Sequence, residues 1–247
     1  MSLPQAPRDR ASYDEAAAIR IALTGRTRDR ARVAARAIAA LHRDPNQTEH
    51  VFSLGIALNA GQLPRVLSEM AVDPMGSKLL REQPAIDRDH VDFAFLRTLP
   101  AHTLGGAYVR MVDELGLDPD MFQPPPGLPE IPAYVTQRIR QTHDLWHLLT
   151  GYGTDVAGEV VLQAFTYGQL RVPSSIVIAL VGGVRIVPRA PGIVRAAFDG
   201  YRRGRQARFL AAVRFEDMWE RDLDEVRTSL QIRPARVTPP TLFVDAA

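Results

Sequence analysis

The stretch RIRQTHDLWHLLTGYGTDVAGEVV, residues 138–161 of 247, decides how the centre of this chain folds. A proline in the first turn and Gly151 directly after the last favour one helix over residues 133–149. The two glycines of TGYGT permit the backbone angles of a tight turn. Thr154 or Asp155 can then cap a second helix. We therefore expect two consecutive helices that fold back on each other.

Four potential metal ligands lie on either side of this turn. His143 and His147 are four residues apart and share one helical face, and Asp144 can point toward the same place from the side. In a continuous helix Glu159 would lie about 18 Å further along the axis than His147. Gly153 lies midway, six residues from His147 and six from Glu159. An antiparallel helix pair therefore brings His147 and Glu159 level with each other.

This spacing indicates a two-helix site for one divalent metal ion, with His143, Asp144, His147 and Glu159 as ligands. Thiolate ligands are excluded because the chain has no cysteine. Two imidazoles with carboxylates suit zinc, iron or manganese better than calcium, and we expect zinc, with iron or manganese as alternatives. The competing interpretation is that the two histidines only form hydrogen bonds in a polar patch.

Arg140 and Asp144 are the candidate catalytic residues. Arg140 lies three residues before His143, so its guanidinium can reach the mouth of the site and bind a substrate carboxylate or phosphate through two hydrogen bonds. An ion pair between Arg140 and Asp144 explains the same spacing equally well. Trp146 lies on the neighbouring stripe, and we interpret it as core packing.

The composition and the hydrophobic patterns favour an all-α protein. Hydrophobic residues make up 46% of the chain and charged residues 23%, which is typical of an ordered globular protein. No long alternation of apolar and polar residues suggests a sheet. An apolar stripe predicts one long helix over residues 208–230, and six prolines in residues 118–132 predict an extended loop. We expect a multi-helix, orthogonal or bundle-like single domain.

Location is predicted from the apolar and charged segments. The N-terminus lacks the apolar core of a secretory signal, and the longest apolar run, residues 176–184, is shorter than the roughly 20 residues that cross a bilayer. We therefore expect a cytoplasmic protein. Residues 185–214 hold eight arginines and one acidic residue, so a basic cluster directly follows this apolar run.

The ligand pattern also carries a resemblance. His-Asp-x-x-His, eleven residues, then Glu resembles the signature of the coenzyme Q biosynthesis protein 4 family, and it is matched in full by the four predicted ligands. The segments LRTLPAHTLGGAYVRMV, YVTQRIRQTHDLWHLLTG and FEDMWERDLDEVRTSLQI also look like segments of that family, over Gly76 to Ile232. The chain departs from the family at Gln141, Thr142 and Gln163, where Glu, Cys and Lys are frequent.

The resemblance implies an all-helical protein of ubiquinone biosynthesis with a lipid-binding cavity between its helices. The implied partners are a polyprenyl-phenol or quinone precursor, an anionic membrane surface, other quinone-biosynthesis enzymes and a second copy in a homodimer. With this resemblance, residues 174–208 are expected to lie on that membrane surface, and the alternative is that residues 176–187 form a buried core helix. The implied reaction is oxidative decarboxylation at ring carbon 1, carried out on the inner face of the membrane. The match is weaker over residues 1–70, which we treat as an N-terminal helical region preceding a domain over residues 71–247 with a short C-terminal tail.

Three other functions compete with this one. The protein could be a non-catalytic lipid-binding scaffold that organises other quinone-biosynthesis enzymes and holds a structural metal. A zinc hydrolase is disfavoured because Asp144, directly after the first histidine, is short for a general base that must reach a bound water. Nucleic-acid binding through the nine arginines of residues 1–43 is disfavoured because the net charge is only +2 and such helices are often solvated faces.

Overall fold

The chain is helical throughout the part that the structure describes. The computed structural model describes residues 21, 26–43, 54–55, 57–59, 61–125, 127–188 and 190–235. Over these residues it contains no strand, only an isolated β-bridge between Thr103 and Asp222. The principal helices are α2 (Thr27–Arg43), α4 (Leu63–Val72), α5 (Pro74–Glu82), α6 (Phe93–Thr98), α7 (Leu104–Leu115), α8 (Glu130–Thr150), α9 (Val156–Leu170), α10 (Pro173–Ile186), α11 (Gly192–Gln206) and α12 (Leu223–Ser229). The prediction of an all-α single domain is confirmed.

Helices α8 and α9 form the predicted pair. The predicted helix over residues 133–149 is confirmed and begins three residues earlier, at Glu130. Gly151 ends it in the left-handed region, at φ 72°, where glycine carries no steric cost, and its N–H donates to the His147 carbonyl. Asp155 caps α9 by accepting a hydrogen bond from the Gly158 N–H at 2.6 Å. The five residues between the helices therefore reverse the chain.

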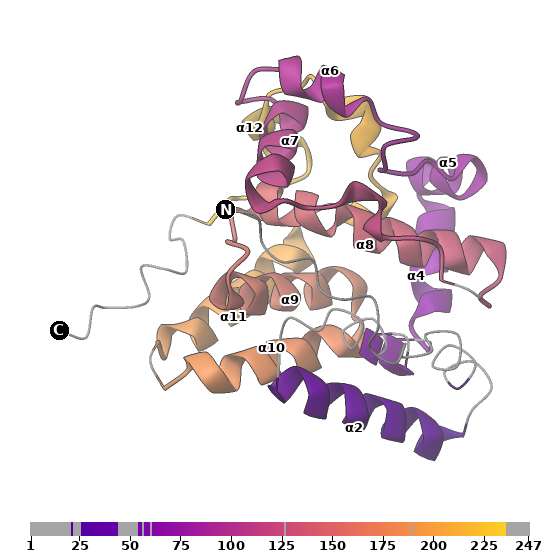
Figure 1. Cartoon of the computed structure of the whole chain (residues 1–247), viewed down its shortest axis with the longest axis vertical. Helices are drawn as coiled ribbons and strands as arrows, with labels where there is room; N and C mark the ends of the chain where they lie inside the picture. Colours follow the sequence, from indigo (N-terminus) through magenta and orange to yellow (C-terminus); the bar gives the residue numbers. More distant parts are fainter. Residues whose placement is uncertain are drawn as a thin grey trace.

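Helix α9 lies against α11 with its backbone in close contact (Figure 1). Two glycines of α11 make this possible. A Cβ atom added at Gly204 would lie 2.2 Å from the Phe165 carbonyl oxygen, and one at Gly200 would lie 2.8 Å from the Val161 carbonyl oxygen. Because no side chain separates the two helices at these points, α11 fixes the position of α9 and of the residues that α9 carries.

The hydrophobic core lies between α7, α8, α9 and the C-terminal segment. Trp146 of α8 is buried there and meets the ring of Phe165 of α9 edge to face, with centroids 6.4 Å apart. The prediction that Trp146 is a core residue is confirmed. Burying one side chain of this size stabilises a fold by about 1.5–3 kcal/mol. The apolar stripe of α8 therefore faces the core and leaves its histidine face free for other contacts.

The predicted single helix over residues 208–230 is wrong. The segment forms two short 3-10 turns, η2 (Leu210–Ala212) and η3 (Phe215–Met218), before α12 begins. Its backbone is held by Arg138 of α8, which is 1% exposed and donates to the Val213 carbonyl at 3.1 Å and to the Glu216 carboxylate at 2.8 Å. These contacts replace the hydrogen bonds of a continuous helix, although most of the apolar stripe is still buried.

Three further predictions concern the proline-rich loop, the N-terminal region and the absence of a membrane-spanning helix. The proline-rich segment contains one 3-10 turn, η1 (Pro119–Met121), its last three residues open α8, and the rest is irregular where it is described. Helix α2 lies along α10 (Figure 1), while residues 1–20 of the predicted N-terminal region lie outside the described residues. No helix in the described ranges combines the length and apolarity needed to cross a membrane.

Candidate metal centre

Three of the four predicted ligands converge between α8 and α9. The rings of His143 and His147 lie one helical turn apart, with centroids separated by 4.8 Å. Glu159 faces both of them from α9. Its Oε2 lies 3.1 Å from His147 Nε2 and its Oε1 lies 3.5 Å from His143 Nε2. The ligand atoms of the three residues all lie within 4.8 Å of one another, so the predicted meeting of the helices is confirmed for this trio.

The donor set itself fits a cation. His147 is 4% exposed, and its Nδ1 lies 3.1 Å from the Tyr152 carbonyl oxygen, which can only accept a hydrogen bond. With Nδ1 acting as the donor, the lone pair of Nε2 in the neutral ring points at the Glu159 carboxylate. Two acceptors at this distance need a positive charge between them, either a proton or a metal ion. A zinc or ferrous ion bound at about 2.0–2.2 Å from each ligand meets this need.

The charges in the trio shift its ionisation strongly. Burial opposes the charged form of His143, but the carboxylates of Glu159 and Asp144 outweigh it and raise the pKa of His143 to about 10. Burial also opposes ionisation of Glu159, but the two histidines hold the pKa of Glu159 well below its usual range. Without a metal, His143 is therefore an imidazolium that faces the Glu159 carboxylate. Its proton occupies the place that a metal ion can take.

Asp144 and Arg140 lie beside the trio. The Asp144 carboxylate is 3.6 Å from His143 Nδ1, the ring nitrogen opposite the one that faces Glu159. In this position Asp144 can orient the His143 ring and increase its basicity, as carboxylates behind metal-bound histidines do. Arg140 is partly buried one turn before His143. The ligand role of Asp144 and the catalytic roles of both residues stay predictions.

Gln163 and Tyr152 belong to the site although the sequence reasoning assigned them no role in it. Gln163 Nε2 donates to Glu159 Oε1 at 2.6 Å along α9 and so holds the carboxylate in place. The spacing of four residues from Glu159 was a usable signal for this contact. The Tyr152 carbonyl, which fixes the His147 ring, gave no such signal because any residue could supply it.

The trio offers three protein ligands, which is the number found in catalytic zinc sites. Structural zinc sites are closed by four protein ligands, whereas catalytic ones use three and leave a position for water or substrate. Two histidines and one carboxylate serve both zinc enzymes and non-haem iron enzymes. The arrangement can therefore polarise a bound oxygen ligand, and it does not by itself select the metal.

The fold and the site together define an all-α protein that presents two imidazoles and a carboxylate from a helical pair. The family model described as coenzyme Q (ubiquinone) biosynthesis protein Coq4 matches residues 23–236 of the chain. The chain belongs to this family, which confirms the resemblance carried by the ligand pattern and its flanks.

Curated relatives agree with this assignment. The mitochondrial ubiquinone biosynthesis protein COQ4 of Meyerozyma guilliermondii is 29% identical over 192 residues, which are 76% of this chain and 61% of the relative. The corresponding homolog of Mus musculus is 31% identical over 194 residues, 77% of this chain and 73% of the relative. That of Bos taurus is 32% identical over 199 residues, 78% and 75% respectively. The chain thus spans less than two thirds of the first of these proteins.

A solved structure shares the fold. A crystal structure of a protein of Nostoc punctiforme assigned to ubiquinone biosynthesis superposes with a TM-score of 0.64 at 25% sequence identity. The superposition covers 80% of this chain and 95% of that protein. The helical arrangement is therefore shared well beyond the segment that carries the ligand pattern.

Proposed function

We propose that this protein acts in ubiquinone biosynthesis, where it binds a polyprenylated aromatic precursor beside a divalent metal ion and supports oxidative decarboxylation at ring carbon 1. The observation that carries the proposal is the convergence of His143, His147 and Glu159 in a chain of this family. A metal bound there supplies a Lewis acid that withdraws electrons from a coordinated ring oxygen or carboxylate.

The residues around the trio have separate roles in this proposal. His143, His147 and Glu159 hold the metal, and Asp144 either completes the ligand set or orients His143 from behind. Arg140 binds the precursor's carboxylate by charge complementarity. Replacing that carboxylate with a hydroxyl group releases carbon dioxide and consumes a two-electron oxidant such as dioxygen. Zinc is the proposed metal, with iron or manganese as alternatives that could themselves take part in oxygen chemistry.

The same family membership supports a second candidate, a non-catalytic scaffold that binds lipid and organises other quinone-biosynthesis enzymes. In that case the metal would only stabilise the α8–α9 pair. The three-residue trio favours catalysis, because a structural zinc requires a fourth protein ligand. Asp144 is the nearest candidate for that fourth ligand, so its position in the metal-bound protein separates the two functions.

Attachment to an anionic membrane surface is part of the proposal. Exposed apolar residues recur at helical spacing on α10, where Leu180 is 63% exposed and Val184 lies one turn further on. On α11, Phe198 is 60% exposed and Val194 lies one turn before it. Exposed arginines accompany them on α11 at positions 195, 202 and 205. Apolar side chains with flanking arginines fit the headgroup region of an anionic bilayer.

The oligomeric state, the protein partners and the location are proposed on the basis of family membership. We place the protein on the inner face of the membrane, as a homodimer in contact with other quinone-biosynthesis enzymes, with the isoprenoid tail in a cavity between helices. The region over residues 71–247 would carry the site, and residues 1–70 would form a separate N-terminal region. The relatives from Meyerozyma, Mus and Bos are named as mitochondrial proteins.

A complementation experiment tests the function. A strain that lacks its own member of this family is supplied with the wild-type chain or with Glu159→Gln, and its lipids are analysed by mass spectrometry. We expect the wild type to restore ubiquinone and Glu159→Gln to leave a carboxylated prenyl-phenol accumulating. Normal ubiquinone levels with Glu159→Gln would favour the scaffold, and failure of the wild type to restore any ubiquinone would contradict the proposal.

A further inference from the structure

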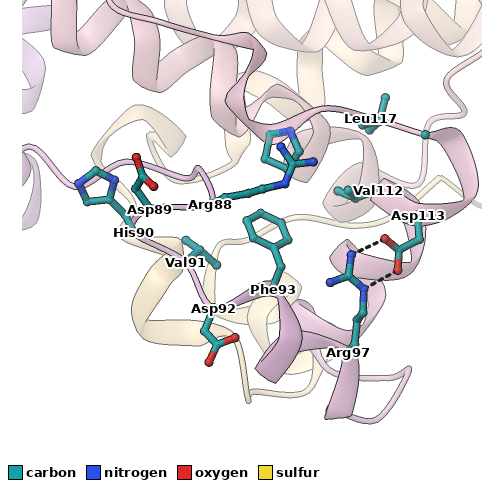
Figure 2. A pocket seen from close by; sticks show the side chains of 12 residues that line it. Arg88, Asp89, His90, Val91, Asp92, Phe93, Arg97, Val112, Asp113 and Leu117 are labelled. Carbon is teal, nitrogen blue, oxygen red and sulfur yellow. Dashed lines mark hydrogen bonds and ion pairs between the residues drawn. The ribbon is translucent and has the colours of Figure 1, made fainter.

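A basin of about 700 Å³ opens beside α6 and α7 (Figure 2), and none of the three metal-ligand candidates lines it. Part of its lining is apolar and includes Val91, Phe93, Val112 and Leu117. The rest consists of Gly116, Pro119 and side chains that are charged or can be. The basin is large enough for an aromatic ring with substituents, and its apolar surface suits the face of such a ring.

The arginines of this basin are already neutralised. Arg97 forms two hydrogen bonds with the Asp113 carboxylate, at 2.9 and 2.7 Å, as the dashed lines in Figure 2 show. Arg88 contacts Asp118 at 2.6 Å and Asp120 at 2.5 Å. A phosphate or carboxylate would have to displace these partners, so the basin favours an uncharged part of a ligand.

A much smaller chamber, of about 10 Å³, lies next to the basin. The same three residues line both cavities and form the partition between them: Val112, Leu117 and Pro119. Gln141 and Asp144 of α8 lie on the far wall of the chamber. The chamber has room for about one oxygen atom and none for a ring.

Gln141 supplies an oriented donor in this chamber. The residue is 4% exposed, and its Oε1 accepts a hydrogen bond from the Ile86 N–H at 3.1 Å. Because a backbone N–H requires an acceptor, this contact fixes which end of the amide is the oxygen. The Nε2 end is buried and has no hydrogen-bond partner among the described residues. A buried donor of this kind calls for an oxygen acceptor, which a ligand or a water molecule can supply.

Asp144 supplies the matching acceptor and the connection to the metal centre. Asp144 lines the chamber, and its carboxylate lies 3.6 Å from His143 Nδ1. A hydroxyl group in the chamber could therefore accept from Gln141 and donate to Asp144, whereas a keto oxygen could satisfy only Gln141. The two side chains together select a hydroxyl group.

We propose that the basin and the chamber form one binding site for a phenolic ring. The hydroxyl group enters the chamber between Gln141 and Asp144, and the ring lies on the apolar surface of the basin after the Leu117 side chain rotates aside. This inference deepens the proposed function and rests on it for the choice of a quinone precursor as the natural ligand. Gln141 is a substrate-binding residue in this arrangement.

Fluorine NMR titration of the full zinc-loaded chain tests the inference with two probes. 4-Fluorophenol carries the hydroxyl group, and fluorobenzene has the same ring without it. We expect the wild type to bind 4-fluorophenol about 5- to 100-fold more tightly, the effect of two hydrogen bonds. Equal dissociation constants for the two probes would overturn the proposal without recourse to any variant.

Two matched variants assign the preference to its residue. Gln141→Met keeps the volume and removes the donor but leaves Asp144 as an acceptor, so we expect the preference for 4-fluorophenol to fall by about 3- to 10-fold while the affinity for fluorobenzene stays within about twofold. Gln169→Met is the control, because Gln169 is a buried glutamine whose amide bonds to Gly204 and Leu210, and none of these three residues lines either cavity. If Gln169→Met lowers the preference to the same extent, or Gln141→Met keeps the wild-type preference, the proposal fails.

A third variant separates this inference from the metal function. Glu159→Gln removes a metal ligand candidate and leaves Gln141 and Asp144 in place. We expect the variant to lose zinc and still to prefer 4-fluorophenol. If the preference disappears together with the metal, the phenol binds the metal and the chamber proposal is overturned. If the wild type binds zinc but shows no preference, only this inference fails and the proposed function stands.

Discussion

His147 Nε2 lies 3.1 Å from Glu159 Oε2, although the two residues belong to different helices and are separated by twelve positions in the chain. The contact depends on the turn between α8 and α9, because the carbonyl of Tyr152 in that turn fixes the other nitrogen of the same ring. The orientation of the ring and the reversal of the chain are therefore set by one short segment. Changes to either side chain should affect metal binding more than folding.

The first prediction concerns metal content. His147→Ala and Glu159→Gln each leave two of the three converging ligands, too few for a stable zinc site. We expect the purified wild type to carry about one zinc per chain and each variant to carry far less, as measured by inductively coupled plasma mass spectrometry. His90→Ala is the matched control, since His90 is exposed and contacts Asp87 outside the trio. Wild-type zinc content in Glu159→Gln would contradict the assignment.

The second prediction concerns Gln163. Its hydrogen bond to Glu159 Oε1 holds the carboxylate toward the histidines, so Gln163→Met should weaken zinc binding by about 10- to 100-fold without unfolding the protein. A competition titration with a chelating dye measures this change. Gln169→Met is the control on the same helix, because Gln169 bonds to Gly204 and Leu210 and should alter stability rather than zinc affinity. Equal zinc affinities for Gln163→Met and the wild type would remove Gln163 from the site.

The third prediction concerns pH. In the metal-free protein the pKa of His143 is raised to about 10, so its ring carries a proton throughout the neutral range. That proton must leave before Nε2 can bind a metal, and a higher pH therefore favours binding. We expect zinc affinity to increase with pH, by up to about tenfold per pH unit below pH 10, with release of a proton. Calorimetry in two buffers of different ionisation enthalpy counts the protons, and an affinity independent of pH would exclude His143 as a ligand.

The convergence of His143, His147 and Glu159 could be predicted from the sequence because the information for it is local. The helix end at Gly151 and the cap at Asp155 are short-range signals, and equal spacing on both sides of the turn places Glu159 opposite His147. The position of Asp144 behind His143 could not be obtained in this way. That contact depends on the conformations of the two side chains, which residue spacing along α8 does not specify.

The C-terminal segment shows why the prediction of a single helix over residues 208–230 failed. An apolar stripe at helical spacing predicts which side chains are buried, but a series of short turns can bury the same side chains. The deciding contact joins Arg138 and Glu216, which are 78 positions apart. Nothing in the sequence around either residue identifies the other as its partner. The chamber beside Gln141 could not be predicted for the same reason, because the residues that line it are distant in sequence.

The fourth prediction concerns this buried ion pair. Replacing Glu216 with Gln leaves the fully buried Arg138 without its charge partner, which should lower the free energy of unfolding by about 3–5 kcal/mol. Denaturant unfolding followed by circular dichroism measures the change. The control is Asp113→Asn, which breaks the solvent-exposed pair with Arg97 and should have a much smaller effect. Similar losses in the two variants would show that burial does not govern the cost.

The fifth prediction concerns the contact between α9 and α11. A Cβ atom at Gly204 would lie 2.2 Å from the Phe165 carbonyl oxygen, and the carbonyl cannot move without displacing α9. We therefore expect Gly204→Ala to destabilise the protein by about 1–3 kcal/mol. Gly183→Ala on α10 is the matched control, because a Cβ there meets nothing within 4 Å and alanine favours a helix interior over glycine by about 0.5–1 kcal/mol. In thermal unfolding, we therefore expect Gly204→Ala to lower the unfolding midpoint and Gly183→Ala to raise it. A midpoint for Gly204→Ala at or above the wild-type value would mean that α11 does not fix the position of α9, and with it Glu159.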